Sequence, residues 1–274
     1  TLSSSSAASD VYKRQDNAVL NGFTIRNGLT SGTAVQSGGG ITCVGSNPRL
    51  ENLIVTNNHA DTEPSAGGIF LKYSNATIKN CVIKENTSQY YGGGIHFKNS
   101  SNSTLTNSKI YNNEAQEKGG ALMFSYSSNP TIKNALIYDN ESYYGNISTN
   151  FSSNPQFINC TIVNNISEIN GNVDIEENCS ISIVNSILHN NQPLEIYPHT
   201  NVSGNPGQIS IESSMIDGGY IGENNISNNP LFVDIDNNDF RLSDFSPAIG
   251  SGDPDISLNF DINNNARPAP NGSN

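Results

Sequence analysis

The chain has 274 residues, of which 34% are hydrophobic, and its formal net charge is −12 at pH 7. Phosphate binding needs clustered lysine and arginine, so this acidic balance argues against a nucleic-acid partner. No apolar run approaches the length of a membrane span. The four cysteines form no CxxC pair, which argues against a zinc site.

Residues 1–17 differ from the rest of the chain. They contain no apolar stretch like that of a signal peptide, and they do not share the pattern that starts at Ala18. We expect a non-native segment of cloning or adapter origin, as found at the ends of metagenomic reads. A native N-terminus and any secretion signal would then be missing.

A seven-residue phrase recurs from residue 21 onward. It begins with asparagine and places isoleucine, valine or leucine near its centre, and a looser copy begins at Ser213. The copies begin at Asn21, Asn52, Asn80, Asn107, Asn134, Asn159 and Asn185. Each copy ends on a second asparagine six positions later: Asn27, Asn58, Asn86, Asn113, Asn140, Asn165 and Asn191. The phrase predicts about eight copies of one structural unit.

Glycine pairs recur in phase with this phrase, each before an apolar residue. Gly67-Gly68 precedes Ile69 and Gly93-Gly94 precedes Ile95, and degenerate copies continue to Gly171-Asn172. A fixed period in this range indicates a solenoid. Because the apolar residues alternate in short runs among asparagine, serine and glycine, strands are favoured over helices.

The predicted fold is all-β: a right-handed parallel β-helix of about eight coils over residues 18–227, with three short strands and three turns per coil. Isoleucine, valine and leucine at alternate positions would build an inner apolar column. Asparagine tolerates the left-handed backbone that turns need. Asparagine side chains stacked about 4.8 Å apart would link successive coils.

The phrases "GGGI…NPRLENLIVTNN" and "NPTIKNALIYDN" resemble the right-handed β-helix repeats of the pectate-lyase-like superfamily. The run "NNPLFVDIDNNDFRLSDFSPAIGSGDP", residues 228–254, resembles the closing segment of bacterial choice-of-anchor Q surface proteins. The resemblance implies a C-terminal closing segment over residues 228–274. It also implies that this segment stops before a final Gly-Ala-Tyr-Glu strand. An extracellular or cell-surface location in a bacterium follows from the same resemblance.

Two of the cysteines occupy one slot of the repeated phrase. Cys81 and Cys160 each follow its first asparagine, where other copies carry small residues such as Ser108 and Ala135. The two thiols are predicted three coils apart, about 14 Å by strand spacing. Because this distance exceeds the reach of a disulfide, we expect buried free thiols.

The strands after the glycine pairs carry the candidate ligand contacts. Counting outward from each glycine pair places Phe70, His96 and Leu122 in one exposed row, and Lys72, Lys98 and Phe124 in the next. The preceding turns bring acidic and aromatic side chains to the same region. Aromatic rings beside polar groups suit the apolar faces and hydroxyls of sugars. The candidate carbohydrate-binding residues are Phe70, Tyr90, Tyr91, Phe124, Tyr143 and Tyr144.

Catalysis is the alternative for the same surface. In polysaccharide lyases of the resembling superfamily, a Lys, Arg or His abstracts a proton beside a uronate carboxylate, and Lys72, His96 and Lys98 are the candidates here. The calcium-binding carboxylates of pectate lyases and the motifs of polygalacturonases have no counterpart in the chain. The stretch "DIDNND" places Asp234, Asp236 and Asn238 where they could bind Ca²⁺. No other cofactor is expected.

Two functions therefore remain open. The first is a secreted or surface-displayed β-helix that binds a polysaccharide or cell-surface glycan, or serves as an adhesive or structural element. The second is a carbohydrate-active enzyme, a lyase acting on uronate-containing glycans. A monomer is expected in either case. The negative charge disfavours an anionic polymer unless a cation bridges the two.

Overall fold

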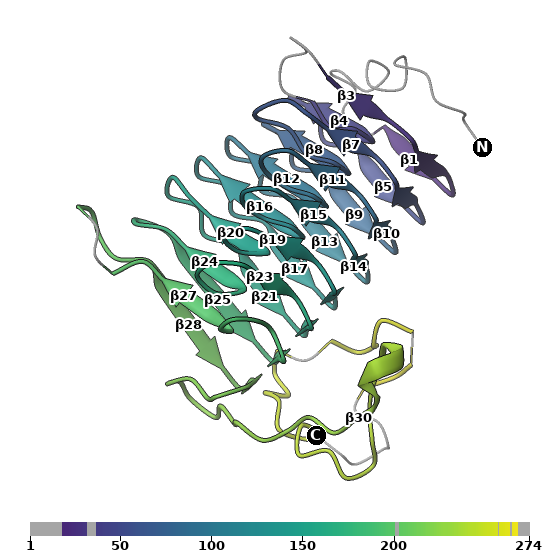
Figure 1. Cartoon of the computed structure of the whole chain (residues 1–274). Helices are drawn as coiled ribbons and strands as arrows, with labels where there is room; N and C mark the ends of the chain where they lie inside the picture. Colours follow the sequence, from purple (N-terminus) through teal and green to yellow (C-terminus); the bar gives the residue numbers. More distant parts are fainter. Residues whose placement is uncertain (1–17, 32–36, 201–202, 257, 264, 268–274) are drawn as a thin grey trace.

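The computed structural model describes residues 18–31, 37–200, 203–256, 258–263 and 265–267. The predicted non-native segment 1–17 lies outside these residues. The chain winds into a parallel β-solenoid of about seven turns, with its C-terminal segment folded against one end (Figure 1). The predicted all-β solenoid is confirmed. Within the described residues, no helix is long and apolar enough to cross a membrane.

Each full coil contributes a strand to four parallel sheets, here called A to D in the order in which the chain visits them. Sheet A contains β1 (Val19–Asn21), β5 (Arg49–Glu51), β9 (Thr77–Lys79), β13 (Thr104–Thr106), β17 (Thr131–Lys133), β21 (Gln156–Ile158), β25 (Ser180–Val184) and β28 (Gln208–Glu212). Sheet B contains β2 (Thr24–Arg26), β6 (Ile54–Thr56), β10 (Val82–Lys84), β14 (Lys109–Tyr111), β18 (Leu136–Tyr138), β22 (Thr161–Val163), β26 (Ile187–His189) and β29 (Met215–Ile216).

The other two sheets have fewer strands. Sheet C contains β3 (Leu29–Thr30), β7 (His59–Ala60), β11 (Thr87–Ser88), β15 (Glu114–Ala115), β19 (Glu141–Ser142) and β23 (Ile166–Ser167). Sheet D contains β4 (Ile41–Val44), β8 (Ile69–Lys72), β12 (Ile95–Lys98), β16 (Leu122–Ser125), β20 (Ile147–Thr149), β24 (Val173–Ile175) and β27 (Ile196–Pro198). The expected three sheets are thus four, because the strands of sheet C have two residues each and are too short to show an alternating pattern.

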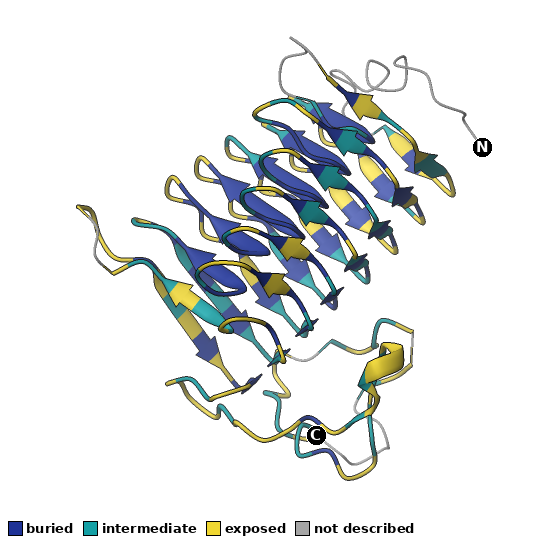
Figure 2. Cartoon of the chain, viewed as in Figure 1, coloured by how far each residue is buried: buried dark blue, intermediate teal, exposed yellow. Residues whose placement is uncertain are grey.

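The inside of the coil is a narrow apolar column. Inward positions of successive strands stack in register, for example Leu50, Ile78, Leu105 and Ile132 on sheet A, all fully buried. Figure 2 shows the buried residues running along the strands, while the turns are more exposed. Each such side chain contributes roughly 1.5–3 kcal/mol of burial free energy. Every coil therefore depends on its neighbours to cover its core.

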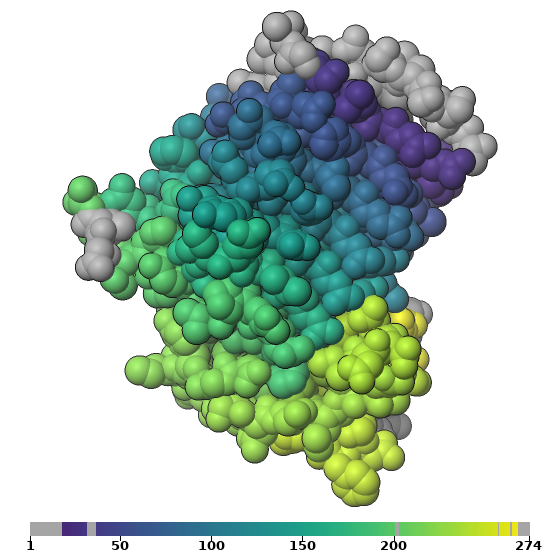
Figure 3. Space-filling view, in the orientation of Figure 1, coloured from purple at the N-terminus to yellow at the C-terminus, as the bar shows by residue number. Residues whose placement is uncertain are grey.

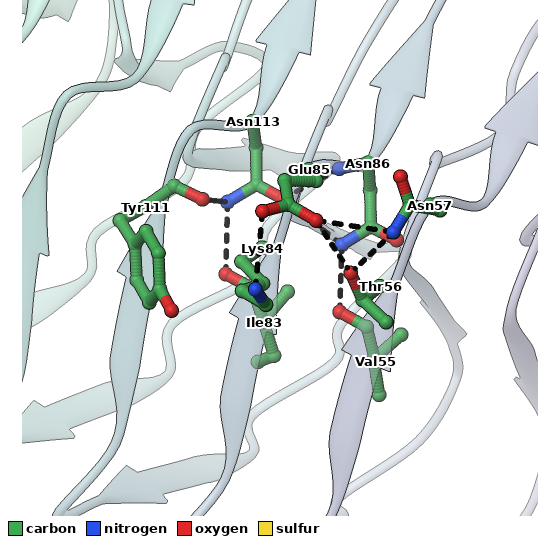
Figure 4. Close-up of polar contacts among 9 residues, drawn as sticks. All are labelled: Val55, Thr56, Asn57, Ile83, Lys84, Glu85, Asn86, Tyr111 and Asn113. Atoms are coloured by element: carbon green, nitrogen blue, oxygen red, sulfur yellow. Dashed lines mark hydrogen bonds and ion pairs between the residues drawn. The ribbon is translucent and has the colours of Figure 1, made fainter. Parts of the chain in front are cut away.

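A buried asparagine ladder, formed by Asn58, Asn86, Asn113, Asn140, Asn165 and Asn191, follows the turn between sheets B and C. The side-chain Nδ2 of each donates to Oδ1 of the next, over 2.8 to 3.0 Å. The backbone N–H of each donates to the same oxygen. Nδ2 also caps strand carbonyls, as Figure 4 shows for Asn86 with Val55 and Asn113 with Ile83. The predicted ladder is confirmed.

The first coil departs from the predicted ladder. Asn27 aligns with Asn57, which lies in the exposed position before the ladder, and both have positive φ. Gly28 occupies the ladder position instead, and its backbone N–H donates to Asn58 Oδ1 at 2.9 Å. Asn21 pairs with Glu51, one residue before the start of the next copy at Asn52, so counting six positions from Asn21 ends one residue short of the ladder.

A second row of asparagines marks the turn between sheets A and B. Asn52, Asn80, Asn107, Asn134, Asn159 and Asn185 all have φ between 51° and 55°. Two of their side-chain contacts are Asn80 Nδ2 to Asn52 Oδ1 at 3.2 Å and Asn134 Nδ2 to Asn107 Oδ1 at 2.8 Å. Asparagine is used here because its short polar side chain tolerates the left-handed region.

The C-terminal segment leaves the solenoid after β29 and returns along it. It forms an antiparallel pair, β30 (Phe232–Asp234) with β31 (Asp239–Leu242), joined through the 3-10 turn η1 (Ile235–Asn237). Phe240 packs edge-on against Tyr138 of sheet B, with ring centroids 5.1 Å apart. The segment also reaches the A–B turn, where Asn185 Nδ2 donates to the Asp253 carbonyl at 2.9 Å. Figure 3 shows it packed against the last coils.

Candidate functional site

Sheet D carries five of the predicted site residues, and its register decides which of them reach the surface: Phe70, Lys72, His96, Lys98 and Phe124. β12 pairs Ile95 with Leu122 and Phe97 with Phe124, so both residues of β16 point into the core and are fully buried. The prediction that Leu122 and Phe124 face outward is therefore wrong. The Phe124 ring stacks on Phe97 inside the solenoid, with centroids 5.2 Å apart, and cannot contact a glycan.

The error has a simple origin in the glycine count. Gly93-Gly94 directly precedes Ile95, whereas Ala121 separates Gly119-Gly120 from Leu122. Ile95 pairs with Leu122 and its N–H donates to the residue before, Ala121. Gly94 N donates to Gly120 O by the same rule, so Gly94 aligns with Ala121. The pair Gly119-Gly120 therefore lies one residue earlier in its coil than Gly93-Gly94. A shift of one residue moves every side chain of a strand to the opposite face.

Phe70 and His96 point outward as predicted, but the turn between sheets C and D covers both. Phe70 is fully buried and His96 is 1% exposed. His96 Nδ1 lies 3.1 Å from the Ser65 carbonyl and Nε2 lies 2.8 Å from Ser125 Oγ. Burial lowers the pKa of His96 to about 3, so the ring is neutral. It is held between protein groups and is not accessible as a surface base.

A glycine lets the turn between sheets C and D lie close against the outer face of sheet D. Gly92 has φ +66°, and a Cβ there would lie 2.7 Å from the His96 Cβ. Any other residue would combine left-handed strain with a steric clash. Gly119 has the same relation to Met123, the counterpart of His96 in the next coil.

Lys72 and Lys98 are half-buried neighbours in the next outward row of sheet D, and each lies beside an aromatic ring. Lys72 Nζ is 5.5 Å from the centroid of Tyr73, and Lys98 Nζ is 4.5 Å from the centroid of Tyr126. Such distances give cation–π attraction. Burial lowers the pKa of Lys98, and the charge of Lys72 lowers it further.

These rings belong to a row that the sequence analysis missed, here called the aromatic ridge: Tyr73, Tyr126 and Phe151. They occupy one position of the turn from sheet D to sheet A, with Asn99 between the first two. Tyr73 is 56% exposed, Tyr126 41% and Phe151 54%. The rings of Tyr126 and Phe151 are stacked, with centroids 4.4 Å apart and an interplanar angle of 20°.

The backbone of the ridge is unusual for aromatic residues. φ is 50° at Tyr73, 56° at Tyr126 and 48° at Phe151, all in the left-handed region. This conformation costs roughly 1–2 kcal/mol per residue outside glycine. The sequence signal was an aromatic residue before a serine in "YSNAT", "YSSNPT" and "FSSNPQ", a phrase separate from the two used to set the register.

The predicted tyrosines lie on the turns between sheets C and D. Tyr90 and Tyr91 are half-buried, and the Tyr91 ring packs edge-on against His96 at 6.2 Å. Burial raises the pKa of Tyr91, and the nearby Glu117 raises it further. Tyr143 is 37% exposed and meets Tyr144 edge-on at 4.8 Å. Their role as carbohydrate contacts stays a prediction.

The proposed calcium stretch forms the turn between β30 and β31. Asp234 caps η1, accepting from Asn237 N at 3.3 Å and from Asn237 Nδ2 at 2.8 Å. Asn238 takes a left-handed conformation with φ 59°. Across the described residues, no three His, Cys, Asp or Glu side chains gather as a metal site. Calcium binding by Asp234, Asp236 and Asn238 stays a prediction.

The four cysteines are buried free thiols, as predicted for Cys81 and Cys160. Burial raises the pKa of the Cys43 and Cys160 thiols to about 12. Thiolates are the reactive form, so these side chains serve as small core residues. Cys81 N donates to Ser108 Oγ at 3.1 Å, so the residues of this slot stack on neighbouring coils.

A cavity of about 1070 Å³ lies between the C-terminal segment and the A–B turns. Asn134, Asn159, Arg241 and Arg267 are among its lining residues, and it contains none of the predicted carbohydrate or catalytic residues. The side-chain oxygen of Asn159 is buried and has no hydrogen-bond partner among the residues that the structure describes. The cavity and the aromatic ridge are therefore separate features.

Comparison with known proteins identifies one family. A family model described as a right handed beta helix region matches residues 9–230. No curated protein and no solved structure matches the chain. The match spans the four sheets of the solenoid and ends before β30.

Proposed function

The chain belongs to the family of right-handed β-helix proteins, and we propose that it binds carbohydrate through the aromatic ridge and the two lysines beside it. One observation carries the proposal: aromatic side chains are kept exposed, in register and in left-handed backbone, where the fold itself gains little from them. Glycine or asparagine would satisfy the same turn with less strain.

The ridge offers what a glycan requires. Sugar rings present apolar C–H faces that pack on aromatic rings, and hydroxyl groups that bond to neighbouring polar side chains. Successive coils are about 4.8 Å apart, so a polymer lying along the solenoid axis can contact Tyr73, Tyr126 and Phe151 in turn. Lys72 and Lys98 add positive charge to a protein of net charge −12, which favours acidic sugars at this place.

Display outside a bacterial cell is part of the proposal. It is supported by the resemblance of residues 228–254 to the closing segment of choice-of-anchor Q surface proteins. An adhesive or structural role on that surface is compatible with the same glycan contact. The regular stack of coils gives a long, repeating face on which several weak contacts can act together.

The experiment is affinity electrophoresis of the whole chain against a panel of soluble polysaccharides. Tyr126→Ala should reduce the retardation given by a bound polymer at least tenfold. Tyr111→Ala is the matched control, because Tyr111 stacks on Tyr138 at 4.7 Å and lies 5.7 Å from Lys84 on sheet B. Equal loss in both variants, or retardation unchanged by Tyr126→Ala, would contradict the proposed surface.

A lyase is the second candidate, supported by the lowered pKa of Lys98 beside Lys72. A proton-abstracting lysine needs its pKa moved in this direction. The test is the ultraviolet absorbance of unsaturated uronate products on a panel of uronate polysaccharides. Product that disappears in Lys98→Met but persists in Lys84→Met would favour the lyase. Retardation without product would favour binding alone.

A further inference from the structure

An ionic cluster on the outer face of sheet D links the coil of β16 to the coil of β24. Asp174 on β24 faces outward yet is fully buried, and Lys118 comes from the turn before β16. Lys118 Nζ lies 3.3 Å from Asp174 Oδ2 and is in direct contact with Glu176 Oε1. The Lys118 side chain is 15% exposed and Glu176 28%.

The other oxygen of Asp174 is held by two donors. His199 Nε2 lies 2.8 Å from Asp174 Oδ1, and Asn170 Nδ2 donates to the same oxygen at 3.0 Å. The Tyr144 ring covers the lysine, with its centroid 5.1 Å from Nζ. The carboxyl group is therefore fixed in orientation, with one oxygen polarised and the other turned toward the amine.

We propose that Lys118 and Asp174 condense into an intramolecular isopeptide bond, with Glu176 carrying the protons. The site contains an amine, a carboxyl group in contact with it, a second carboxylate on the same nitrogen, and donors for the carbonyl oxygen. Held in place by the folded solenoid, the two reacting groups have the high effective concentration of an intramolecular reaction.

The reaction balances within the cluster. Glu176 takes a proton from the Lys118 ammonium and delivers it to Asp174 Oδ2, and the freed lone pair on Nζ attacks Cγ. The π electron pair moves to Oδ1, where His199 and Asn170 stabilise the negative charge. Glu176 moves a second proton from Nζ to Oδ2, the pair on Oδ1 reforms the carbonyl, and Oδ2 leaves as water. The Nζ–Cγ bond forms, the Cγ–Oδ2 bond breaks, and no outside reactant is needed.

The environment favours the product. Burial acts to lower the pKa of Lys118, but Asp174 and Glu176 outweigh it and raise the pKa overall. The precursor is thus a charged pair, and a buried pair carries a large desolvation cost. Condensation removes both charges, while the amide N–H can still donate to Glu176 and the carbonyl oxygen can still accept from His199 and Asn170.

The bond would close a long loop of the chain. Lys118 and Asp174 are 56 residues apart in sequence, with the coil of β20 between their own. A crosslink of this length restricts the unfolded chain, as a disulfide does. In a family whose coils are held only by their neighbours, it would prevent this part of the solenoid from separating coil by coil.

The test is the intact mass of the whole folded chain, measured after transfer to denaturant so that an ion pair cannot survive. The proposal expects the wild-type chain to be lighter than its sequence by one water. Proteolysis should release a single branched peptide that contains both Lys118 and Asp174. Glu176→Gln should keep the contact with Nζ and abolish the mass loss. Lys118→Arg removes the reacting amine and should also abolish it.

Two further variants sharpen the result. Asp174→Asn should lose ammonia in place of water, because an amide then supplies the leaving group, whereas Lys133→Arg on β17 should retain the wild-type mass loss. A wild-type chain that keeps its full sequence mass after prolonged incubation would overturn the proposal. So would a water loss that maps to another residue. The wild-type measurement decides by itself, so a variant that fails to fold leaves the result unaffected.

Discussion

Replacing one buried ladder residue, Asn113→Ala, should strongly destabilise the solenoid. Asn113 Oδ1 accepts from the backbone N–H of Asn86 at 3.1 Å and from its Nδ2 at 2.9 Å. Its own Nδ2 donates to Ile83 O and to Asn140 Oδ1, each at 3.0 Å. Alanine removes these bonds, together with the one from Nδ2 to Tyr111 O at 3.1 Å, and leaves two buried donor groups of Asn86 short of an acceptor. At about 1–3 kcal/mol for each unpaired group, the expected loss is about 4 kcal/mol.

Asn102→Ala is the matched control for this substitution. Asn102 also links two coils, accepting from Asn129 N at 2.8 Å, but it is exposed and water can replace it. Its loss should cost less than about 1 kcal/mol. Urea unfolding followed by circular dichroism measures both variants, with the slope of the transition as a check on the unfolded state. A loss for Asn113→Ala no larger than that for Asn102→Ala would refute the argument that burial makes the ladder stabilising.

Three other predictions follow from burial and charge. Phe124→Ala should lower the free energy of unfolding in urea by about 3–5 kcal/mol because it leaves a cavity in the core. Phe151→Ala on the aromatic ridge should lower it by less than about 1 kcal/mol. Equal losses would contradict the register of sheet D. The pKa of His96 falls from 6.5 in the unfolded chain to about 3 in the folded chain, so its stabilising contribution is present above pH 6.5 and is lost as the pH falls from there toward 3. His96→Gln should flatten that part of the plot of unfolding free energy against pH. An unchanged plot would show that the ring is not buried in its neutral form. Glu195 ends the asparagine ladder, accepting from Asn191 Nδ2 at 2.6 Å, and burial raises its pKa to about 7. Stability should therefore fall as the pH rises from 4.5 to about 7. Glu195→Gln should remove this pH dependence from the melting temperatures.

The coil and its ladders were predictable because each copy of the phrase carries the same information. Asn86, Asn113 and Asn140 recur with the strands of sheet B, so their stacking follows from the period alone. The short strands of sheet C escaped notice because two residues cannot display an alternation. The family match over residues 9–230 covers the part of the chain in which the period is regular.

The candidate site was less predictable, because facing outward is not the same as being exposed. Alternation correctly placed Phe70 and His96 on the outer face of sheet D. It could not show that the turn passing over Gly92 covers them. The aromatic ridge lay in turn residues that were treated as spacers, and its rings are notable only when exposure and backbone conformation are considered together.

The sequence by itself determined the solenoid, its inner column and the ladder of asparagines, because these depend on a period and on residue types that repeat with it. Only the tertiary structure decided which face each strand of sheet D presents, since Ala121 takes the position of Gly94 and the glycine pair before it lies one residue earlier in its coil. It also brought Lys118 to Asp174 and stacked Tyr126 on Phe151. Those contacts depend on where separate coils place individual side chains, and a repeating pattern carries no information about the positions at which it is broken.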